Sequence, residues 1–442
     1  MDLARSGARA ALPRPPVRST LTPLEDAVAA LRLGKLTPRR ALTLLKALGP
    51  GLVAGASDND PTSVASLAVV GATTTYGLSW LLILLIPMLV VVQLVSAAVG
   101  VASRGGLEDA IRARYGRAWA LLALLAVLAV TLLTLAADLE GGGAALGLLT
   151  GVPYRWFVPP LAVAVAALLV WGSYDALQRV LRWVLLVFLA YVATAFLAHP
   201  DWGRVLHETI APPLRFSGDY IAGALALLGT TLTSYAYVWE TVEEAEERPP
   251  LHRLGLVQVD AGAGMVVAGA LFWFIVIGTG ATLGVRHQQV QTAQDAARAL
   301  APVAGRFASA LFGVGLLASA AIAIPVLAGT SAYVMAEAFG WRASLDARFA
   351  RARKFYVALL VSLAVGVGLT FVGIAPIRLL FLSSLAGGLA TPLTLVLLLL
   401  AARDRQVMGD RRIGRGLAAA GWVVAAVVTV AALLFLWQQF AG

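Results

Sequence analysis

Two carboxylates stand close together in the first long apolar stretch of the chain. Asp58 and Asp60 flank Asn59, and Pro61 follows directly. Carboxylate and amide oxygens bind hard cations such as Mg2+. At the centre of a bilayer each charge would cost about 2.5–3.5 kcal/mol, and the proline would remove a helix hydrogen bond. Because so costly a sequence indicates a function, we predict a cation site with Asp60 as principal ligand and Asp58 as a second ligand or attractor.

The stretch that carries these acids cannot be one regular helix. Residues 45–56 alone are too short to span a bilayer, so residues 57–63 as a simple loop between two helices is the weaker interpretation. A discontinuous helix whose non-helical middle lines a polar cavity fits better.

A second polar segment lies near the middle of the chain. Five of the seven residues from Gly229 to Tyr235 carry a hydroxyl group. Such residues are common in membrane helices, so the segment alone is a weak signal. Together, two interruptions at corresponding positions in two halves are typical of an inverted-repeat transporter with its site at the midplane.

Further acids fall inside or beside apolar stretches. Asp138 and Glu140 follow a long apolar run, and they are either carboxylates near the outer mouth of a tilted helix or acids of the site's surroundings and ion pathway. Other acids at predicted cytoplasmic helix ends are expected to be solvated, with a cation exit vestibule as the alternative. These are Glu240, Glu243, Glu244, Glu246, Glu247, Asp260 and Glu337.

Composition makes the chain an all-α membrane protein. Its 442 residues are 60% hydrophobic and 13% charged, whereas soluble proteins are about 45–50% apolar and about 25% charged. Apolar stretches of about 20 residues recur, which suits helices and not the alternating strands of a membrane barrel. We predict eleven spans, at 45–70, 77–101, 117–149, 156–172, 179–198, 219–243, 255–283, 305–337, 355–373, 376–402 and 416–439.

The net charge of +10 describes topology rather than a nucleic-acid partner. With a cytoplasmic N-terminus, 27 of the 34 Lys and Arg residues fall on the cytoplasmic side and 7 on the other. This asymmetry predicts that the N-terminus is cytoplasmic and the C-terminus is not. The chain has no cysteine, so disulfides and thiolate ligands are excluded.

Several motifs resemble those of the Nramp family of divalent metal transporters. Gly49-Pro50-Gly51 leading to Asp60-Pro61 is similar to the first helix of that family, in a variant typical of a divergent bacterial branch close to the Nramp-related magnesium transporters. The similarity covers about residues 44–402. The other matching segments are 137–139, 229–231, 242–247, 324–333 and 388–392.

The resemblance implies a LeuT-type fold with helices one and six unwound. It implies a first inverted repeat at 44–198 (spans one to five), a second at 218–402 (spans six to ten), and an eleventh span at 414–439. The polar N-terminal residues themselves predict a cytoplasmic tail at 1–43, in which a short amphipathic helix could form on the membrane surface.

The family's metal ligands can be carried over by position. The metal-binding Asp falls on Asp60, its Asn on Ser63 and a carbonyl donor on Ser57. In the sixth helix, the family's methionine falls on Thr233 and a second carbonyl donor on Thr230. These four neutral residues are expected to donate directly or through water.

Two departures from the family pattern bear on substrate and coupling. A thioether selects softer metals, so its loss at Thr233 favours a hard cation. Tyr235 replaces the family's histidine, which puts proton coupling in doubt, while Asp138 matches an acidic position of the proton route. Tyr235, Asp138 and Glu140 are therefore candidates for a proton or ion pathway.

We predict a secondary-active, multi-pass transporter of the bacterial inner membrane that takes up Mg2+, with Mn2+ second, by alternating access. It would work as a monomer, with the lipid bilayer and the cation as its partners and no cofactor. The main alternative is a LeuT-fold transporter of another solute, such as another metal, an organic cation or an amino acid. An enzyme is the weakest interpretation, because no zinc, nucleophile-elbow or phosphate-loop motif is present.

Overall fold

The computed structural model describes residues 60–171, 189–247, 254–345, 347 and 349–441. Within these ranges the regular elements are all helical. Their bounds are α4 Pro61–Thr74, α5 Ser79–Ser103, α6 Leu107–Tyr115, α7 Arg117–Thr150, η1 Tyr154–Trp156, α8 Val158–Trp171, α10 Trp202–Ile210, α11 Gly218–Thr231, α12 Ser234–Glu247, α13 Leu254–Thr279, η3 Gly280–Gly284, α14 Ala293–Arg298, α15 Ala301–Ala304, η4 Gly305–Phe307, α16 Ala308–Phe339, α17 Arg353–Thr370, α18 Pro376–Arg403, α19 Arg405–Met408, η5 Gly409–Arg411 and α20 Arg415–Ala441.

Nine helical stretches in the described part of the chain are long and apolar enough to cross a membrane. They correspond to nine of the eleven predicted spans. The other two predicted spans, 45–70 and 179–198, fall partly on residues that the structure does not describe. The predicted tail and its amphipathic helix also lie outside the described residues.

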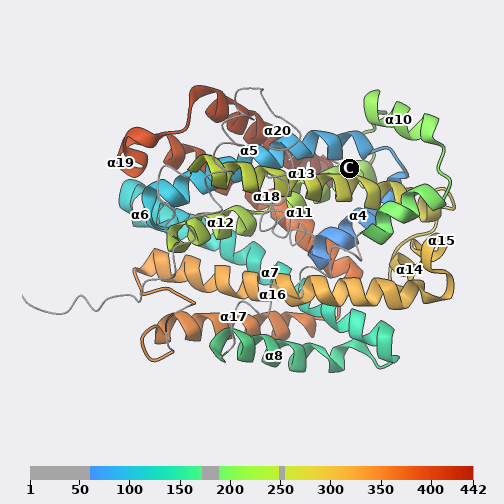
Figure 1. The fold of residues 1–442 in the computed structure, drawn as a ribbon, viewed down its shortest axis with the longest axis horizontal. Coiled ribbons are helices and arrows are strands. Elements are labelled where there is room, and N and C mark those ends of the chain that lie inside the picture. Colours follow the sequence, from blue (N-terminus) through green and yellow to red (C-terminus); the bar gives the residue numbers. More distant parts are fainter. Residues whose placement is uncertain (1–59, 172–188, 248–253, 346, 348, 442) are drawn as a thin grey trace, which may run out of the picture. The chain divides into compact units, whose positions relative to one another are not determined.

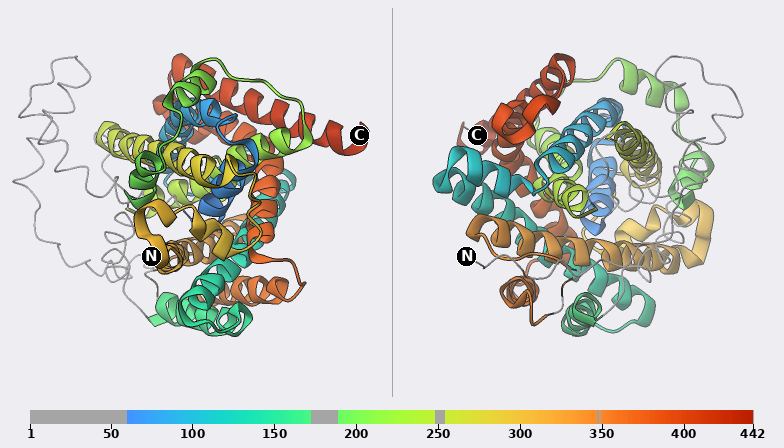
Figure 2. Two further views of the ribbon diagram at one scale, coloured as in Figure 1. Left: turned by 90° about the vertical axis from the view of Figure 1, so that its right-hand side faces the viewer. Right: turned by 60° about the vertical axis from the view of Figure 1, so that its left-hand side comes forward.

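The helices form two groups with a central layer between them (Figures 1 and 2). In one group α7 packs along α16 and α17, and α8 packs against α17. In the other, α5 packs against α12 and α13. The central helices α4, α11 and α18 pack against one another, and α4 also contacts α7 and α13. The start of α4 therefore lies inside the bundle, against both groups.

The described residues include the C-terminal side of the first predicted interruption and all of the second. In the first, α4 begins at Pro61, where proline is tolerated because the missing N–H would have no helical partner. The loop alternative for 57–63 is wrong for residues 61–63, which form the first turn of α4. In the second, α11 ends at Thr231 and α12 begins at Ser234, so helix six is broken at two residues, Leu232 and Thr233.

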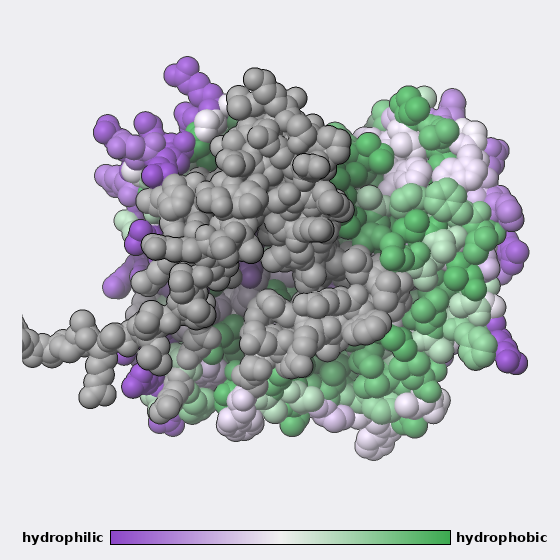
Figure 3. All heavy atoms as spheres, in the orientation of Figure 1, coloured by the Kyte–Doolittle hydropathy of each residue, from purple (hydrophilic) through white to green (hydrophobic). Residues whose placement is uncertain are grey.

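The coloured surface agrees with a bundle that crosses a membrane. In the view of Figure 3, apolar side chains cover the flank of the helices, and hydrophilic ones gather toward the two ends of the bundle. Because the long helices run between these ends, the apolar flank is the face that lipid would cover.

Candidate functional site

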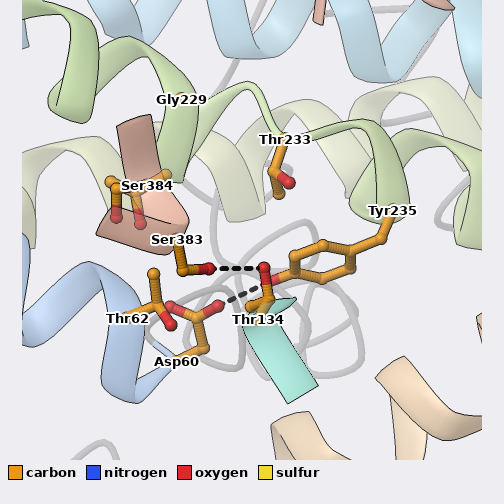
Figure 4. Close-up of a pocket in the computed structure, with 9 residues that line it drawn as sticks. Asp60, Thr62, Thr134, Gly229, Thr233, Tyr235, Ser383 and Ser384 are labelled. Atoms are coloured by element: carbon orange, nitrogen blue, oxygen red, sulfur yellow. Dashed lines mark hydrogen bonds between the residues drawn. The ribbon is translucent and has the colours of Figure 1, made fainter. Parts of the chain in front are cut away.

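A narrow cavity lies between the start of α4 and the break in helix six (Figure 4). It is small, and its lining side chains lie close together. Among the described residues that line it, one is charged, seven carry hydroxyl groups and one is glycine: Asp60, Thr62, Thr134, Gly229, Thr230, Thr233, Tyr235, Ser383 and Ser384. A single negative charge among hydroxyl oxygens is a donor set that suits a hard cation.

Asp60 is held at the N-terminus of α4 by two hydrogen bonds. Its Oδ1 accepts from the backbone N–H of Ser63 at 2.6 Å, which makes Asp60 the N-cap of the helix. Its Oδ2 accepts from the Tyr235 hydroxyl at 2.5 Å. The helix dipole favours a negative charge there, although the residue is only 2% exposed. An ionised carboxylate has about four lone-pair sites, so both bonds leave capacity for a cation.

The start of α4 and both halves of helix six are joined to each other across the cavity. Besides the bond from Tyr235 of α12 to Asp60, the hydroxyls of Ser63 and Thr230 lie 3.0 Å apart. Each half of helix six therefore makes a polar contact with the first turn of α4. A movement of either half would change the geometry around the Asp60 carboxylate.

The break in helix six is held open by α18. Thr391 donates its hydroxyl to the carbonyl oxygen of Leu232 at 2.9 Å, which satisfies a backbone group released by the break. Gly229 lies against the same helix. A Cβ at this position would come within 2.0 Å of the Ser384 carbonyl oxygen and 2.2 Å of the Gly388 nitrogen. Only glycine fits this approach.

Asp138 lies behind the cavity rather than in its wall. Its Oδ1 accepts from both the backbone N–H and the hydroxyl of Thr62, at 3.2 and 2.7 Å. Its Oδ2 has no hydrogen-bond partner among the described residues. These bonds hold the first turn of α4 in place. Thr62 lines the cavity, so Asp138 is linked to the cavity through Thr62.

Glu140 is buried in α7 but does not reach the cavity. Neither of its carboxyl oxygens has a partner among the described residues. Both Asp138 and Glu140 are 0% exposed, so neither carboxyl group is in contact with solvent.

Of the residues predicted for the site, four line the cavity: Asp60, Thr230, Thr233 and Tyr235. Ser63 lies next to it, bonded to Thr230. Asp58 and Ser57 lie outside the described residues.

Comparison with known proteins assigns the chain to a family. The family model described as natural resistance-associated macrophage protein-like, Nramp, matches residues 51–438. This chain belongs to the Nramp family. The divalent metal cation transporter MntH of Deinococcus radiodurans is 28% identical over 440 residues, covering 95% of this chain and 96% of the relative. The chain is accordingly a divalent metal cation transporter of the membrane and not an enzyme, and the metal is its cargo rather than a cofactor.

Solved structures confirm the LeuT-type fold of this Nramp chain. A crystal structure of the Eremococcus coleocola manganese transporter, at 19% identity, has a TM-score of 0.70 and covers 92% of this chain and 89% of that one. MhsT in complex with L-phenylalanine, at 14% identity, has a TM-score of 0.59, with 89% and 98% covered.

Four hydroxyl-bearing residues that line the cavity of this Nramp chain were not predicted from the sequence. Thr62 follows the Asp-Pro motif, and Thr134 and Ser383 are joined across the cavity at 2.7 Å (Figure 4). Ser384 lies 2.6 Å from the Ser66 hydroxyl. The adjacent serines of α18, just before the matching segment at 388–392, were the available signal. Single Ser and Thr residues in membrane helices carry little information, since most of them only pack or bond to their own backbone.

The site of this Nramp chain lacks soft donors. None of the cavity-lining residues is a methionine, and Thr233 occupies the position for which the family resemblance implies one. Within the described residues, no three His, Cys, Asp or Glu side chains group as a resident metal centre would require. The described lining of the cavity therefore offers oxygen donors only.

Proposed function

We propose that this chain takes up both Mg2+ and Mn2+, with Asp60 as the principal ligand of the transported ion. The observation that carries the proposal is one buried carboxylate surrounded by hydroxyl groups. Oxygen ligands suit magnesium, calcium and manganese, whereas a thioether would select softer metals. Without that thioether, the site has little means of rejecting Mg2+.

Two separate observations support the two ions. Mn2+ is supported by relatives, since the Eremococcus coleocola protein is described as a manganese transporter. Mg2+ is supported by the donors of this chain. Mg2+ gives up its waters reluctantly, and hydroxyls such as those of Ser383 and Ser384 can bind an ion through a retained water.

The remaining candidate residues have supporting roles in this proposal. Ser63, Thr230 and Thr233 would donate to the ion directly or through water, and Ser57 would supply a backbone carbonyl. Asp58 would attract the cation or bind it. Tyr235, Asp138 and Glu140 would carry a proton or line the ion's path in a symport mechanism.

The proposed transport cycle is alternating access by a monomer in the bacterial inner membrane. The inverted repeats would be 44–198 and 218–402, with 414–439 as an added span and 1–43 as a cytoplasmic tail. The distribution of Lys and Arg supports a cytoplasmic N-terminus and an extracytoplasmic C-terminus. The polar contacts between α4 and both halves of helix six support a movement of these helices together.

Competition between the two ions tests the substrate proposal. In proteoliposomes, an excess of Mg2+ of about tenfold should reduce Mn2+ uptake by at least about half, because ions of similar affinity share one site. Protein-free liposomes give the background. If about a hundredfold excess of Mg2+ leaves Mn2+ uptake unchanged, the site discriminates by more than about 2.7 kcal/mol, and Mg2+ is not a substrate.

Replacing Thr233 with methionine should shift selectivity toward softer metals. The thioether would enter the cavity at the position of the hydroxyl. We expect Cd2+ to become a stronger inhibitor of Mn2+ uptake by about tenfold, and Mg2+ to become a weaker one. Thr233→Val removes the hydroxyl without adding sulfur and serves as the control. Equal Cd2+ inhibition of Thr233→Met and Thr233→Val would mean that residue 233 does not contact the ion.

A further inference from the structure

Two glutamates meet far from the cation cavity, where α6 connects α5 to α7. Glu108 is the second residue of α6, and Glu337 lies in the last turn of α16. Glu337 was expected to be solvated, but this is wrong. It is only 7% exposed and Glu108 is 0% exposed, because α6 covers the end of α16.

The packing brings the Glu337 carboxyl group onto the N-terminus of α6. A Cβ at Gly106 would lie 2.0 and 2.2 Å from its two oxygens, so the carboxyl group sits directly against the backbone of Gly106. The backbone N–H of Asp109 donates to Glu337. The carboxyl group of Glu108, in the first turn of the same helix, lies next to that of Glu337, and neither oxygen of Glu108 has a hydrogen-bond partner among the described residues. The two acids are therefore close neighbours.

No cation neutralises this pair within the described part of the chain. Besides both oxygens of Glu108, one oxygen of Glu337 also lacks a donor there. Arg112 of α6 pairs with Asp109 at 2.8 Å, and Arg114 pairs with Asp404 at 2.6 Å. The other titratable groups on α6, and on and between the elements packed against it, are Arg104, Tyr115, Arg117, Asp138, Glu140, Tyr235, Tyr237, Glu240, Glu243, Glu244, Glu246, Glu247, Tyr333, Arg378, Arg403 and Arg405.

Two buried carboxylates that lie side by side cannot both be ionised without a neighbouring cation. If one carboxyl group is protonated, its O–H donates to the other and the contact becomes attractive. We propose that Glu108 and Glu337 together bind one proton, at a site separate from the cation cavity.

The position of this proton site links it to a helix that lines the cation cavity. The backbone N–H of Leu107 donates to the Thr241 hydroxyl of α12 at 3.2 Å. The same helix carries Tyr235, which contacts Asp60. Loss of the proton would place two negative charges between α6 and α16, beside α12. The proton would thus control how firmly α6 holds these two helices.

The expected pH range follows from the burial of Glu108. Burial raises the pKa of this carboxyl group to about 7, compared with about 4.3 in an unfolded chain. The folded protein then binds more protons than the unfolded one between these values, so stability falls as pH rises through this range. The stabilisation is complete below about pH 4.3 and is lost above about pH 7.

Melting temperatures of the purified full-length protein at about pH 5 and about pH 8 test the proposal. Wild-type protein should lose several degrees between these values. The melting temperatures of Glu108→Gln and Glu337→Gln should fall much less between these pH values, and both variants should be more stable than wild type at the higher pH. The reason is that the glutamine amide donates a hydrogen bond at any pH, as the protonated carboxyl group does. Asp410→Asn, at a side chain that is 96% exposed, is the control. Infrared spectra should show that both glutamine variants lack a protonated-carboxyl band that titrates near neutral pH in wild type.

Two results would overturn the proposal. One is that both glutamine variants follow the pH dependence of wild type and Asp410→Asn. The other is stabilisation by added Mn2+ or Mg2+ that both glutamine variants lose and Asp60→Asn retains, since the pair would then bind a metal. None of these readouts depends on transport, so the proton site can fail while the proposed function stands.

Discussion

Asp60→Asn should abolish metal-dependent uptake while leaving the protein folded. Asparagine caps a helix about as well as aspartate, so the hydrogen bond from Ser63 and the start of α4 should persist. The substitution removes the one charge among the described residues of the cavity wall. Mutation of a residue that hydrogen-bonds to a metal ligand typically lowers the metal affinity about 10–100-fold. Removal of the charge of the ligand itself should therefore lower the affinity at least about 100-fold.

The matched control for this substitution is Asp219→Asn. Asp219 is exposed in the first turn of α11, away from the cavity. It undergoes the same chemical change, so any general effect of lost charge appears in both variants. Uptake of Mn2+ and Mg2+ into proteoliposomes should be unchanged for Asp219→Asn. Wild-type uptake by Asp60→Asn would show that another residue binds the ion.

Gly229→Ala should disrupt the contact between α11 and α18 and reduce both stability and transport. The added methyl group would lie 2.0 Å from the Ser384 carbonyl oxygen, and backbone atoms cannot move aside as a flexible side chain can. Overpacking typically costs about 1–3 kcal/mol, and contact with backbone places this position at or above that range. The gain in helix propensity from glycine to alanine, about 1 kcal/mol, is too small to compensate.

Gly368→Ala provides the comparison for the glycine prediction. Gly368 lies in α17, and a Cβ there would meet no atom within 4 Å. This variant should be as stable as wild type or slightly more stable. Melting temperature and the yield of monodisperse protein measure both effects. Equal behaviour of the two alanine variants would mean that α11 and α18 do not pack as closely as described.

The cation site is predictable where the sequence breaks a physical rule. A charge and a proline inside an apolar span are costly, so Asp60 and the first interruption stand out from the residue types alone. The hydroxyl-rich segment at 229–235 indicates a site only when it is considered together with the interruption at Asp60. The fold adds that Pro61 starts a helix instead of continuing the break.

Contacts between distant segments were not predictable. Thr62 and Asp138 are 76 residues apart. No local pattern in the sequence indicates that the Asp138 carboxylate would hold the start of α4, which Asp60 caps. The expectation for Glu337 was wrong for a related reason. A charged residue at a helix end is usually solvent-exposed. Here α6, a short helix between two spans, covers Glu337, and the absence of a side chain at Gly106 lets the carboxyl group approach the backbone.

The most direct test of the cation site is a crystal structure with Mn2+, whose anomalous scattering locates the ion independently of the protein. We predict a peak in the cavity, either coordinated by the Asp60 carboxylate or one water away from it, with oxygen atoms of Thr230, Thr233, Ser383 or Ser384 around it. An ion bound elsewhere with this cavity empty, at a Mn2+ concentration that supports uptake, would contradict the assignment.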